Sequence, residues 1–394
     1  MKKYKKILNY GSQYIDKDDI KIVSKSLKKK FLTSGPLVNK FENNLKNFFN
    51  VKNAHVCNSG TSAIFLALLS IGLSKGDKVI LPSINFIAAA NMVKFLGATP
   101  FFADVNPLTA QMETTDVKNC IKKNKVKKIK AIIVMYNGGY PRSIKEYWKL
   151  KKELKCYLIE DACHALGSDY LEKGIKQKIG SCMFSDIATF SLHPLKTITT
   201  CEGGIVTTNN KIISEKIKLY RSHGIIRKNK FWEYDVKHVG FNFRLNDVSC
   251  ALGISQLKKI KKILSYRKKI HKIYIKNLNN FKNILTIIDE EKSTNSSFHL
   301  VIALIDFEFL KISKDIFLKT LQKHNIFCQV HYIPNYKFKA FKGNHKLSGA
   351  EKYFKECISL PIHLNLRERD VYTIISVIKK IIESRLKKSK NFIN

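Results

Sequence analysis

The 394-residue sequence has few acidic residues, little proline or tryptophan, and no long apolar run. It holds 31 Asp and Glu against 71 Lys and Arg, with 8 Pro and 2 Trp. No apolar stretch approaches the ~18 residues of a membrane span, and the basic N-terminal segment lacks the apolar stretch of a signal peptide. Hydrophobic residues at 44% and charged residues at 26% exclude a disordered or fibrous chain.

The nine cysteines show no Cys-x-x-Cys spacing, and their number is odd. This pattern argues against a disulfide framework and against a zinc finger, so we expect no metal site. Scattered thiols in a chain of this size are typical of a reducing compartment. We therefore expect a cytoplasmic protein.

The formal net charge of +40 has two interpretations. One is a protein that binds nucleic acid or an anionic membrane. The other is a compositional bias that places lysines on every solvated face. The lysine-rich runs at 28–30, 122–130, 258–262 and 387–390 are spread along the chain, and no RNA-binding signature accompanies them. The second interpretation is favoured, with no nucleic acid or membrane as partner.

Residues 41–255 alternate between short apolar runs and helical segments. We expect strands at 78–82, 99–105, 130–136, 156–161, 187–192 and 203–209. This rhythm predicts an α/β fold with a mostly parallel sheet between helices. Residues 1–40 read as an N-terminal arm, with a short amphipathic helix before the turn-like segment LTSGPL.

Residues 256–394 predict a smaller α+β domain. A long basic helix at 255–278 is followed by strands at 299–305 and 326–332 and by a final helix at 370–388. The final helix should bury one apolar face. That face consists of Val371, Ile374, Ile375, Ile378, Ile381 and Ile382.

Two residues could perform chemistry at the strand ends. Asp161 ends an apolar strand, where open α/β sheets bind ligands, and its carboxylate could hold a protonated pyridine nitrogen. The alternative is an ordinary helix N-cap. Lys196 lies in an uncharged segment between two predicted strands, where desolvation would favour a neutral, nucleophilic amine. The alternative is an exposed loop lysine.

Two further features precede them in the chain. Gly60, Thr61 and Ser62 lie at the expected start of a helix, where free N–H groups and hydroxyls could bind a phosphate or simply cap the helix. Phe86 could stack on an aromatic ring or belong to the core. With Asp161 and Lys196, these features match the needs of a pyridoxal phosphate (PLP) enzyme.

In its motifs the sequence resembles the DegT/DnrJ/StrS nucleotide-sugar aminotransferases, of the fold-type-I PLP-dependent class (aspartate aminotransferase-like). The resemblance runs from Tyr10 to His363 and rests on NSGTSA, EDACHALGS, FSLHPLKTITTCEGG, RSHG and GFNFRLNDVSCALGISQL. It implies that Lys196 binds PLP as a Schiff base and moves a proton, and that Asp161 pairs with the pyridinium nitrogen. His164 would lie near the 3-oxygen of the ring.

The same resemblance implies the remaining binding residues. The phosphate would be bound by Gly60, Thr61 and Ser191, the ring would stack on Phe86, and Asn242 would reach the site of the other subunit in a homodimer. The implied substrate positions are Tyr10, Lys30, Phe31, Leu32, Thr33, Gln329, Val330, His331 and Tyr332. His331 could equally be a hydrogen-bonded histidine within a strand.

The implied reaction moves an amino group from an amino acid, expected to be L-glutamate, to C4 of a UDP-linked 4-keto-6-deoxy-N-acetylhexosamine. Three alternatives stay open: a C3 or C4 aminotransferase for a dTDP or GDP sugar, a dehydratase, and a non-catalytic regulatory or nucleic-acid-binding protein. Lys196 argues against the dehydratase branch, in which histidine replaces the reactive lysine. Lys196 and Asp161 together argue against the non-catalytic protein.

Overall fold

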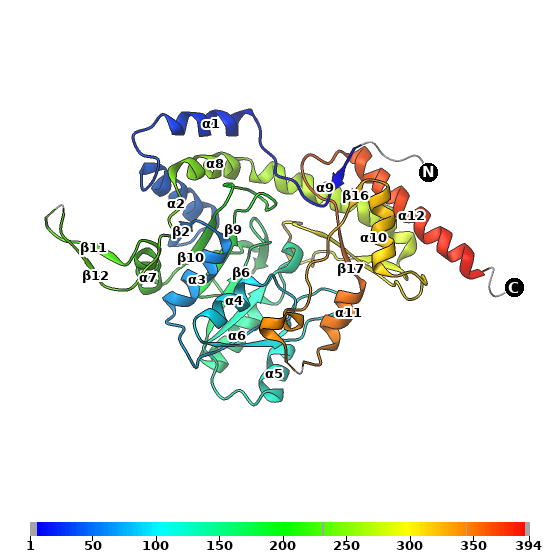
Figure 1. The fold of residues 1–394 in the computed structure, drawn as a ribbon, viewed down its shortest axis with the longest axis horizontal. Helices are drawn as coiled ribbons and strands as arrows, with labels where there is room; N and C mark the ends of the chain where they lie inside the picture. Colours follow the sequence, from blue (N-terminus) through cyan, green and yellow to red (C-terminus); the bar gives the residue numbers. More distant parts are fainter. Residues whose placement is uncertain (1–5, 231, 344, 391–394) are drawn as a thin grey trace.

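The structure is a computed structural model that describes residues 6–230, 232–343 and 345–390, with side chains as far as residue 387. A seven-stranded sheet forms the centre of the molecule (Figure 1). Its strands, in spatial order, are β2 (Asn53–Cys57), β10 (Gly204–Thr208), β9 (Ile187–Ser191), β6 (Tyr157–Asp161), β5 (Ala131–Met135), β3 (Lys78–Pro82) and β4 (Thr99–Ala103). β10 alone runs in the direction opposite to the other six strands of this sheet, which confirms the predicted α/β fold with a mostly parallel sheet.

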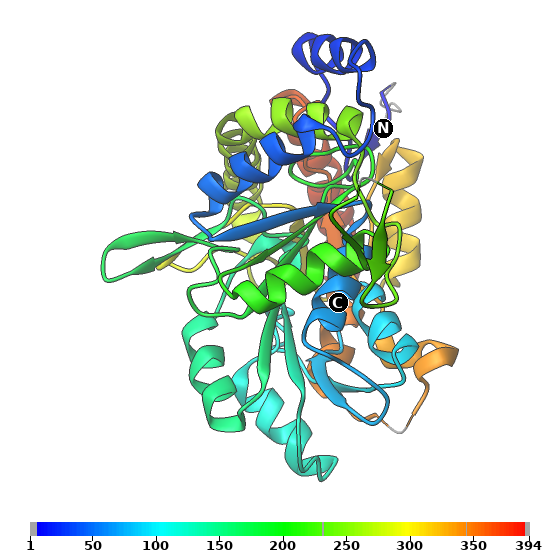
Figure 2. The ribbon, with the colours of Figure 1, turned by 90° about the vertical axis from the view of Figure 1, so that its left-hand side faces the viewer.

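The strands are short, apolar and covered on both faces. Every residue of β5 is buried, as expected for a central parallel strand without polar–apolar alternation. The covering helices are α2 (Pro36–Phe49), α3 (Gly60–Ser70), α4 (Ala88–Phe95), α5 (Thr114–Lys123), α6 (Ile144–Leu154) and α7 (Lys211–Arg221). Helix α3 is buried along nearly all of its length and packs on β9 and β10, which fixes its N-terminus beside the strand ends (Figure 2).

The N-terminal residues join distant parts of the fold. Strand β1 (Leu8–Asn9) pairs in parallel with β16 (Ile326–Phe327), and α1 (Lys17–Leu27) lies along α8 (Asp247–Lys258) at the top of Figure 1. The expected boundaries at 40/41 and 255/256 fall within α2 and α8 respectively. The three-part division of the chain therefore stays a proposal.

The C-terminal part is a small antiparallel sheet with helices. Its strands β13 (Leu285–Ile287), β15 (Val301–Ile305) and β17 (Cys357–Leu360) pair in that order. Its helices are α9 (Ile260–Leu278), α10 (Lys314–Lys323), α11 (Ser348–Glu356) and α12 (Glu368–Lys390), with short 3₁₀ turns η2 (Asn279–Phe281), η3 (Asn335–Lys337) and η4 (Lys339–Phe341). The six residues expected on the apolar face of α12 are all buried, which confirms that prediction.

The strand expected at 326–332 is mostly absent. Only Ile326 and Phe327 form β16, because β1 offers just two residues for pairing. Gln329 then makes a single bridge to Ser359, and the following residues, His331 and Tyr332, line a cavity. The shortness of this strand therefore frees two side chains for the site.

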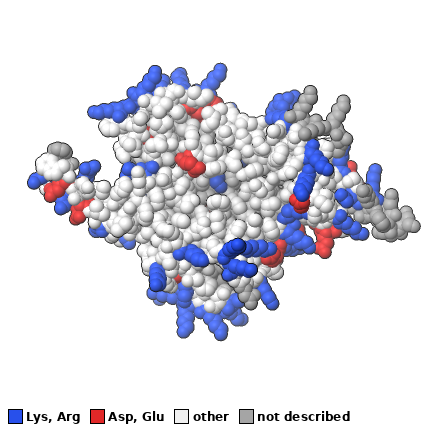
Figure 3. All heavy atoms as spheres, in the orientation of Figure 1, with Lys and Arg blue, Asp and Glu red and all other residues white. Residues whose placement is uncertain are grey.

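Several short, polar strands gave no clear signal in the sequence. They are β7 (Asp169–Glu172), β8 (Ile175–Lys178), β14 (Thr294–Asn295), β11 (Ile225–Arg227) and β12 (Tyr234–Val236). The β11–β12 hairpin projects from the body of the molecule at the left of Figure 1. Figure 3 shows Lys and Arg distributed around the margins of the visible face. Within the described ranges, no helix is both long enough and apolar enough for a bilayer.

Candidate active site

A cavity of about 400 Å³ opens where the central sheet, α3 and the C-terminal part meet. This size is ordinary for a small-molecule site. Its walls include the last residues of three neighbouring strands, Met135, Asp161 and Ser191, together with the N-terminus of α3. The cavity therefore lies at the carboxyl edge of the sheet, where open α/β folds bind their ligands.

Asp161 places a buried carboxylate against this cavity. Its side chain is 3% exposed, and Oδ2 accepts a hydrogen bond from Asn85 Nδ2 at 3.2 Å. Oδ1 accepts a weaker one from the Cys163 N–H at 3.3 Å. No helix begins after β6 at this point, so the interpretation as a helix N-cap does not hold. Two neutral donors leave capacity for a cationic N–H partner from the cavity.

Lys196 lines the same cavity from the loop after β9. Burial lowers the pKa of its ammonium group, while the nearby Cys163 and Asp161 partly oppose that shift. A lowered pKa increases the share of neutral amine, which is the nucleophilic form. The interpretation of Lys196 as an ordinary exposed loop lysine is therefore not supported.

The start of α3 forms a cradle of backbone N–H groups. Ser59 caps the helix, because its hydroxyl accepts the N–H of Ser62 at 3.0 Å. A Cβ at Gly60 would come within 2.7 Å of Ser191 Cβ, so glycine keeps the backbone of α3 and β9 in close approach. The N–H groups of Gly60 and Thr61 have no carbonyl partner within the helix and lie at the positive end of its dipole. This cradle fits a phosphate.

Phe86 follows β3 and lines the same cavity with a side chain that is 55% exposed. It is therefore not a core residue. Its ring centroid lies 5.9 Å from that of Tyr332. An apolar ring that is open to the cavity can cover the face of a bound aromatic group.

Two predicted histidines also face the cavity. His164 is 1% exposed, accepts the Gly138 N–H through Nδ1 at 3.2 Å, and contacts Tyr332 through Nε2 at 2.9 Å. His331 Nδ1 bonds Ser359 Oγ at 2.8 Å, and burial lowers the pKa of His331 to about 3. His331 is thus hydrogen-bonded, as one of the two interpretations required, but it lies outside any strand. Its ring centroid lies 5.3 Å from that of Tyr10.

Other predicted residues lie outside this cavity. The segment 30–33 is exposed before α2, where the carbonyl of Leu32 accepts the N–H of Asp247 at 2.9 Å. Gln329 and Val330 lie beside β16, outside the cavity wall. Asn242 is exposed and bridges to Ser222. The site roles expected for these residues are not met within one chain and stay proposals.

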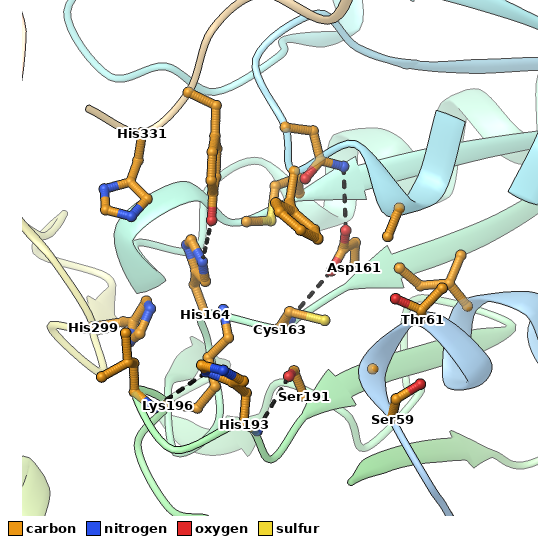
Figure 4. Close-up of a pocket in the computed structure, with 18 of the residues that line it drawn as sticks. Ser59, Thr61, Asp161, Cys163, His164, Ser191, His193, Lys196, His299 and His331 are labelled. Carbon is orange, nitrogen blue, oxygen red and sulfur yellow. Dashed lines mark hydrogen bonds between the residues drawn. The ribbon is translucent and has the colours of Figure 1, made fainter. Parts of the chain in front are cut away.

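The structure adds lining residues that the sequence analysis did not name, among them Asn85, Cys163, His193 and His299. Asn85 and Cys163 directly neighbour named residues, so their sequence positions offered a signal. His299 offered none, because it comes from the C-terminal part. Its ring lies 4.2 Å from that of His164, and its Nδ1 is buried without a hydrogen-bond partner among the described residues. Figure 4 shows His164 and His299 on one side of the site and Ser59 and Thr61 on the other.

The fold and this combination of groups define the class. The cavity fits PLP, because each of its groups matches one part of that molecule. These groups are an amine of lowered pKa, a strand-end carboxylate, an exposed aromatic ring and a phosphate cradle. A seven-stranded, mostly parallel sheet carrying such a site is that of a fold-type-I aminotransferase.

The chain belongs to the DegT/DnrJ/EryC1/StrS aminotransferase family, whose profile matches residues 13–379. The UDP-4-amino-4,6-dideoxy-N-acetyl-β-L-altrosamine transaminase of Campylobacter jejuni subsp. jejuni serotype O:23/36 (strain 81-176) is 38% identical over 389 residues, covering 95% of this chain and 98% of that protein. The protein is therefore a nucleotide-sugar aminotransferase family enzyme, as predicted.

Solved structures agree with this assignment. Helicobacter pylori PseC, an aminotransferase of pseudaminic acid biosynthesis, superimposes with a TM-score of 0.88 at 34% identity, covering 96% of this chain and all of PseC. The PLP form of Spr1654 from Streptococcus pneumoniae gives a TM-score of 0.87 at 25% identity, over 96% of this chain and all of that one. The family and the PLP form of this relative imply PLP as cofactor.

Proposed function

We propose that this protein uses PLP to transfer an amino group from L-glutamate to C4 of a UDP-4-keto-6-deoxy-N-acetylhexosamine, which yields UDP-4-amino-4,6-dideoxy-N-acetyl-β-L-altrosamine. The main support for this proposal is that Lys196, Asp161 and the phosphate cradle of α3 line one cavity. The substrate is supported by the activity named for the Campylobacter jejuni relative. The product would enter pseudaminic acid biosynthesis, the process named for PseC.

PLP, when bound, supplies an electron sink for the bond that breaks at the substrate carbon. The Asp161 carboxylate keeps the ring nitrogen protonated, which strengthens that sink. Lys196 holds the cofactor and afterwards carries a proton to and from the reacting carbon. The N–H groups of Gly60 and Thr61 and the Ser191 hydroxyl bind the phosphate.

The cofactor assignment is tested at Lys196. We expect wild-type protein with PLP to absorb visible light, and borohydride to fix a covalent adduct on the peptide that contains Lys196. Lys196→Ala should lose the adduct and the activity, whereas the exposed control Lys122→Ala should keep both. A colourless wild-type protein without that adduct would overturn the proposal.

The substrate assignment is tested with a panel of keto-sugar nucleotides. With glutamate as donor, the UDP-4-keto-6-deoxy-N-acetylhexosamine should give the 4-amino sugar, identified by mass and NMR. Faster turnover of a dTDP- or GDP-linked sugar would instead place the enzyme in another branch of the same family. Binding to nucleic acid at physiological salt, without turnover of any sugar in the panel, would support the non-catalytic alternative.

The Asn242 role requires a homodimer with shared sites. In its support, the β11–β12 hairpin and the segment after it expose apolar residues that a second copy could cover. These include Tyr234, Val236 and Val239, the last being 85% exposed. Mixing Lys196→Ala with Asn242→Ala protein should restore activity, because each mixed dimer keeps one site with both residues. Absence of recovery after verified subunit exchange would exclude this sharing.

A cytoplasmic location stays a prediction. It is supported by the nine cysteines, all of which are unpaired, as in a reducing compartment. Fractionation of the source cells, with detection by an antibody to this protein, would test it.

A further inference from the structure

Two further cavities adjoin the active site at Lys196. The inner cavity, of about 10 Å³, has Lys196 in its wall, as the active-site cavity does. The outer cavity, of about 380 Å³, has the exposed residues Lys262 and Ser265 in its wall. Tyr14 and Leu364 line both the inner and the outer cavity. The three cavities therefore follow one another from the active site, past Lys196, to the surface.

The partition between the inner and the outer cavity contains Tyr14 and Leu364. These residues belong to two segments that are hydrogen-bonded to each other, because Asn365 Nδ2 donates to the carbonyl oxygen of Gln13 at 2.9 Å and to Ser12 Oγ at 3.3 Å. The contacts hold the two segments together. The size of the side chains in the partition therefore determines how far the two cavities are open to each other.

The inner cavity is polar and large enough for one water molecule. Its volume of about 10 Å³ is close to that of one water-sized sphere. Its wall contains the buried polar residues Thr197, Thr199 and Gln256. It also contains Arg267, whose Nη1 donates to three carbonyl oxygens but whose Nε is buried without a hydrogen-bond partner among the described residues. A water molecule in this cavity would give the Nε–H group the acceptor that buried N–H groups normally have.

Transamination needs water beside Lys196. In the first half of the reaction, Lys196 is released as a free amine and one water molecule is consumed. The oxygen of that water passes to the oxo acid, and its two hydrogens pass to the nitrogen that stays on the cofactor. In the second half, the keto oxygen of the sugar leaves as water with two hydrogens from that nitrogen, and Lys196 is bound again. Water must therefore enter and leave while a substrate occupies the active-site cavity.

We propose that the inner cavity holds a water molecule bound by Arg267, and that water reaches and leaves Lys196 through this cavity from the outer one. The proposal rests on the proposed function, because the demand for water arises from the exchange of amino groups at Lys196. The passage stays open when a sugar nucleotide fills the active-site cavity. The structure thus separates the route of water from that of the substrate.

The first test is a crystal structure of the wild-type protein at a resolution that shows ordered water. We expect one water molecule in the inner cavity within hydrogen-bond distance of Arg267 Nε, with or without PLP. In Ser12→Leu, the larger side chain should occupy the inner cavity and displace that water, because Ser12 lines it. A wild-type map that shows ordered water elsewhere in the interior but none in the inner cavity overturns the proposal.

The second test compares two single-turnover reactions of the PLP-loaded protein, followed by visible absorbance. One starts from L-glutamate, and the other starts from UDP-4-amino-4,6-dideoxy-N-acetyl-β-L-altrosamine. Both consume one water molecule, but only the second fills the active site with a nucleotide. In Ser12→Leu we expect the rate with the amino sugar to fall about tenfold and the rate with glutamate to fall less, with the Kd of both substrates unchanged. Equal slowing with both substrates, or no slowing at all, overturns the proposal.

Ser265→Leu is the matched control for Ser12→Leu. Ser265 is exposed and lines the outer cavity but not the inner one, so this variant should turn over both substrates at wild-type rates. Two substitutions at Leu364 test the partition independently, in case Ser12→Leu does not fold. Leu364→Phe should slow the amino sugar because a larger side chain closes the partition, whereas Leu364→Ala should not, because it widens the partition. Equal rates in these two variants contradict the passage.

The outcomes distinguish this proposal from the proposed function. If wild-type protein forms the PLP adduct at Lys196 and turns over the amino sugar, but the inner cavity is dry and the blocked variants react at wild-type rates, only the water passage fails. If wild-type protein forms no adduct at Lys196, the proposed function fails and the passage fails with it.

Discussion

Asn85 donates a hydrogen bond from Nδ2 to Oδ2 of Asp161 at 3.2 Å, while the amide oxygen of Asn85 is buried without a hydrogen-bond partner among the described residues. Asp161 ends β6 and Asn85 follows β3, so the contact fixes the carboxylate relative to the sheet edge. Asn85 and the Cys163 N–H, both neutral donors, orient Asp161 without neutralising it. The carboxylate therefore keeps its charge for a cationic partner in the cavity.

This arrangement predicts that Asp161→Asn retains cofactor but loses most turnover. The amide keeps the size of the side chain but cannot stabilise a protonated ring nitrogen. We expect kcat to fall about a hundredfold, because a charge-assisted hydrogen bond that operates in the transition state is lost. Steady-state kinetics with cofactor content measured on the same samples will check this.

The relevant control for Asp161→Asn is Asn85→Ala. It leaves the charge in place and removes one of the two donors that orient the carboxylate, so a smaller loss of kcat is expected. A near-normal rate in Asp161→Asn would contradict the role of the carboxylate.

The close approach at Gly60 predicts a specific loss of cofactor affinity. In Gly60→Ala, the new Cβ would lie 2.7 Å from Ser191 Cβ, so α3 must move away from β9 and the phosphate cradle must deform. We expect the Kd for PLP to rise at least tenfold, as measured by equilibrium titration. Gly11→Ala should bind normally, because its added carbon meets only Leu195, at 3.5 Å. Equal Kd values for the two variants would exclude the cradle.

The sequence predicted those site residues whose signal is local. Asp161 stands at the end of an apolar run, and Lys196 stands in an uncharged segment, so both could be singled out and the cavity contains both. The alternation of apolar runs likewise predicted the central sheet, since buried parallel strands carry their signal in consecutive residues.

The sequence could not predict contacts that depend on tertiary packing. His299 reaches the cavity because Arg267 of α9 donates to its carbonyl oxygen at 3.2 Å, and nothing near residue 299 shows this. The segment 326–332 has the composition of a strand, but its length is limited by β1, which is more than 300 residues away in the chain. Such long-range constraints leave no local pattern.

Arg267 provides a prediction about stability. Its side chain is 3% exposed, and Nη1 donates to the carbonyl oxygens of Phe298, His299 and Ile362. Arg267→Met removes the donor for these carbonyls, so we expect the free energy of unfolding to fall by about 3 kcal/mol. Chemical denaturation will measure this, with the exposed Lys272→Met on the same helix as a control of unchanged stability. A free energy of unfolding that falls no further in Arg267→Met than in Lys272→Met would contradict the role of Arg267.

Glu160 predicts a pH dependence of stability that is separate from the chemistry. It adjoins Asp161 in β6, but strand alternation places its side chain on the other face of the sheet. There it accepts hydrogen bonds from Tyr136, at 3.0 Å, and from Ser185. Burial raises the pKa of the Glu160 carboxyl from 4.5 to about 7, so the folded state retains this proton more strongly than the unfolded chain does.

The sign of the effect follows from this difference in proton affinity. The stabilisation from the proton on Glu160 is fully present below pH 4.5 and is lost as the pH rises to about 7, a change of about 3 kcal/mol. Glu160→Gln cannot ionise, so the variant should become more stable relative to wild type over this range and keep a constant advantage above it. Denaturation of both proteins at a series of pH values gives the difference directly and cancels the contributions of all other titrating groups. A difference that is independent of pH would show that Glu160 does not titrate in this interval.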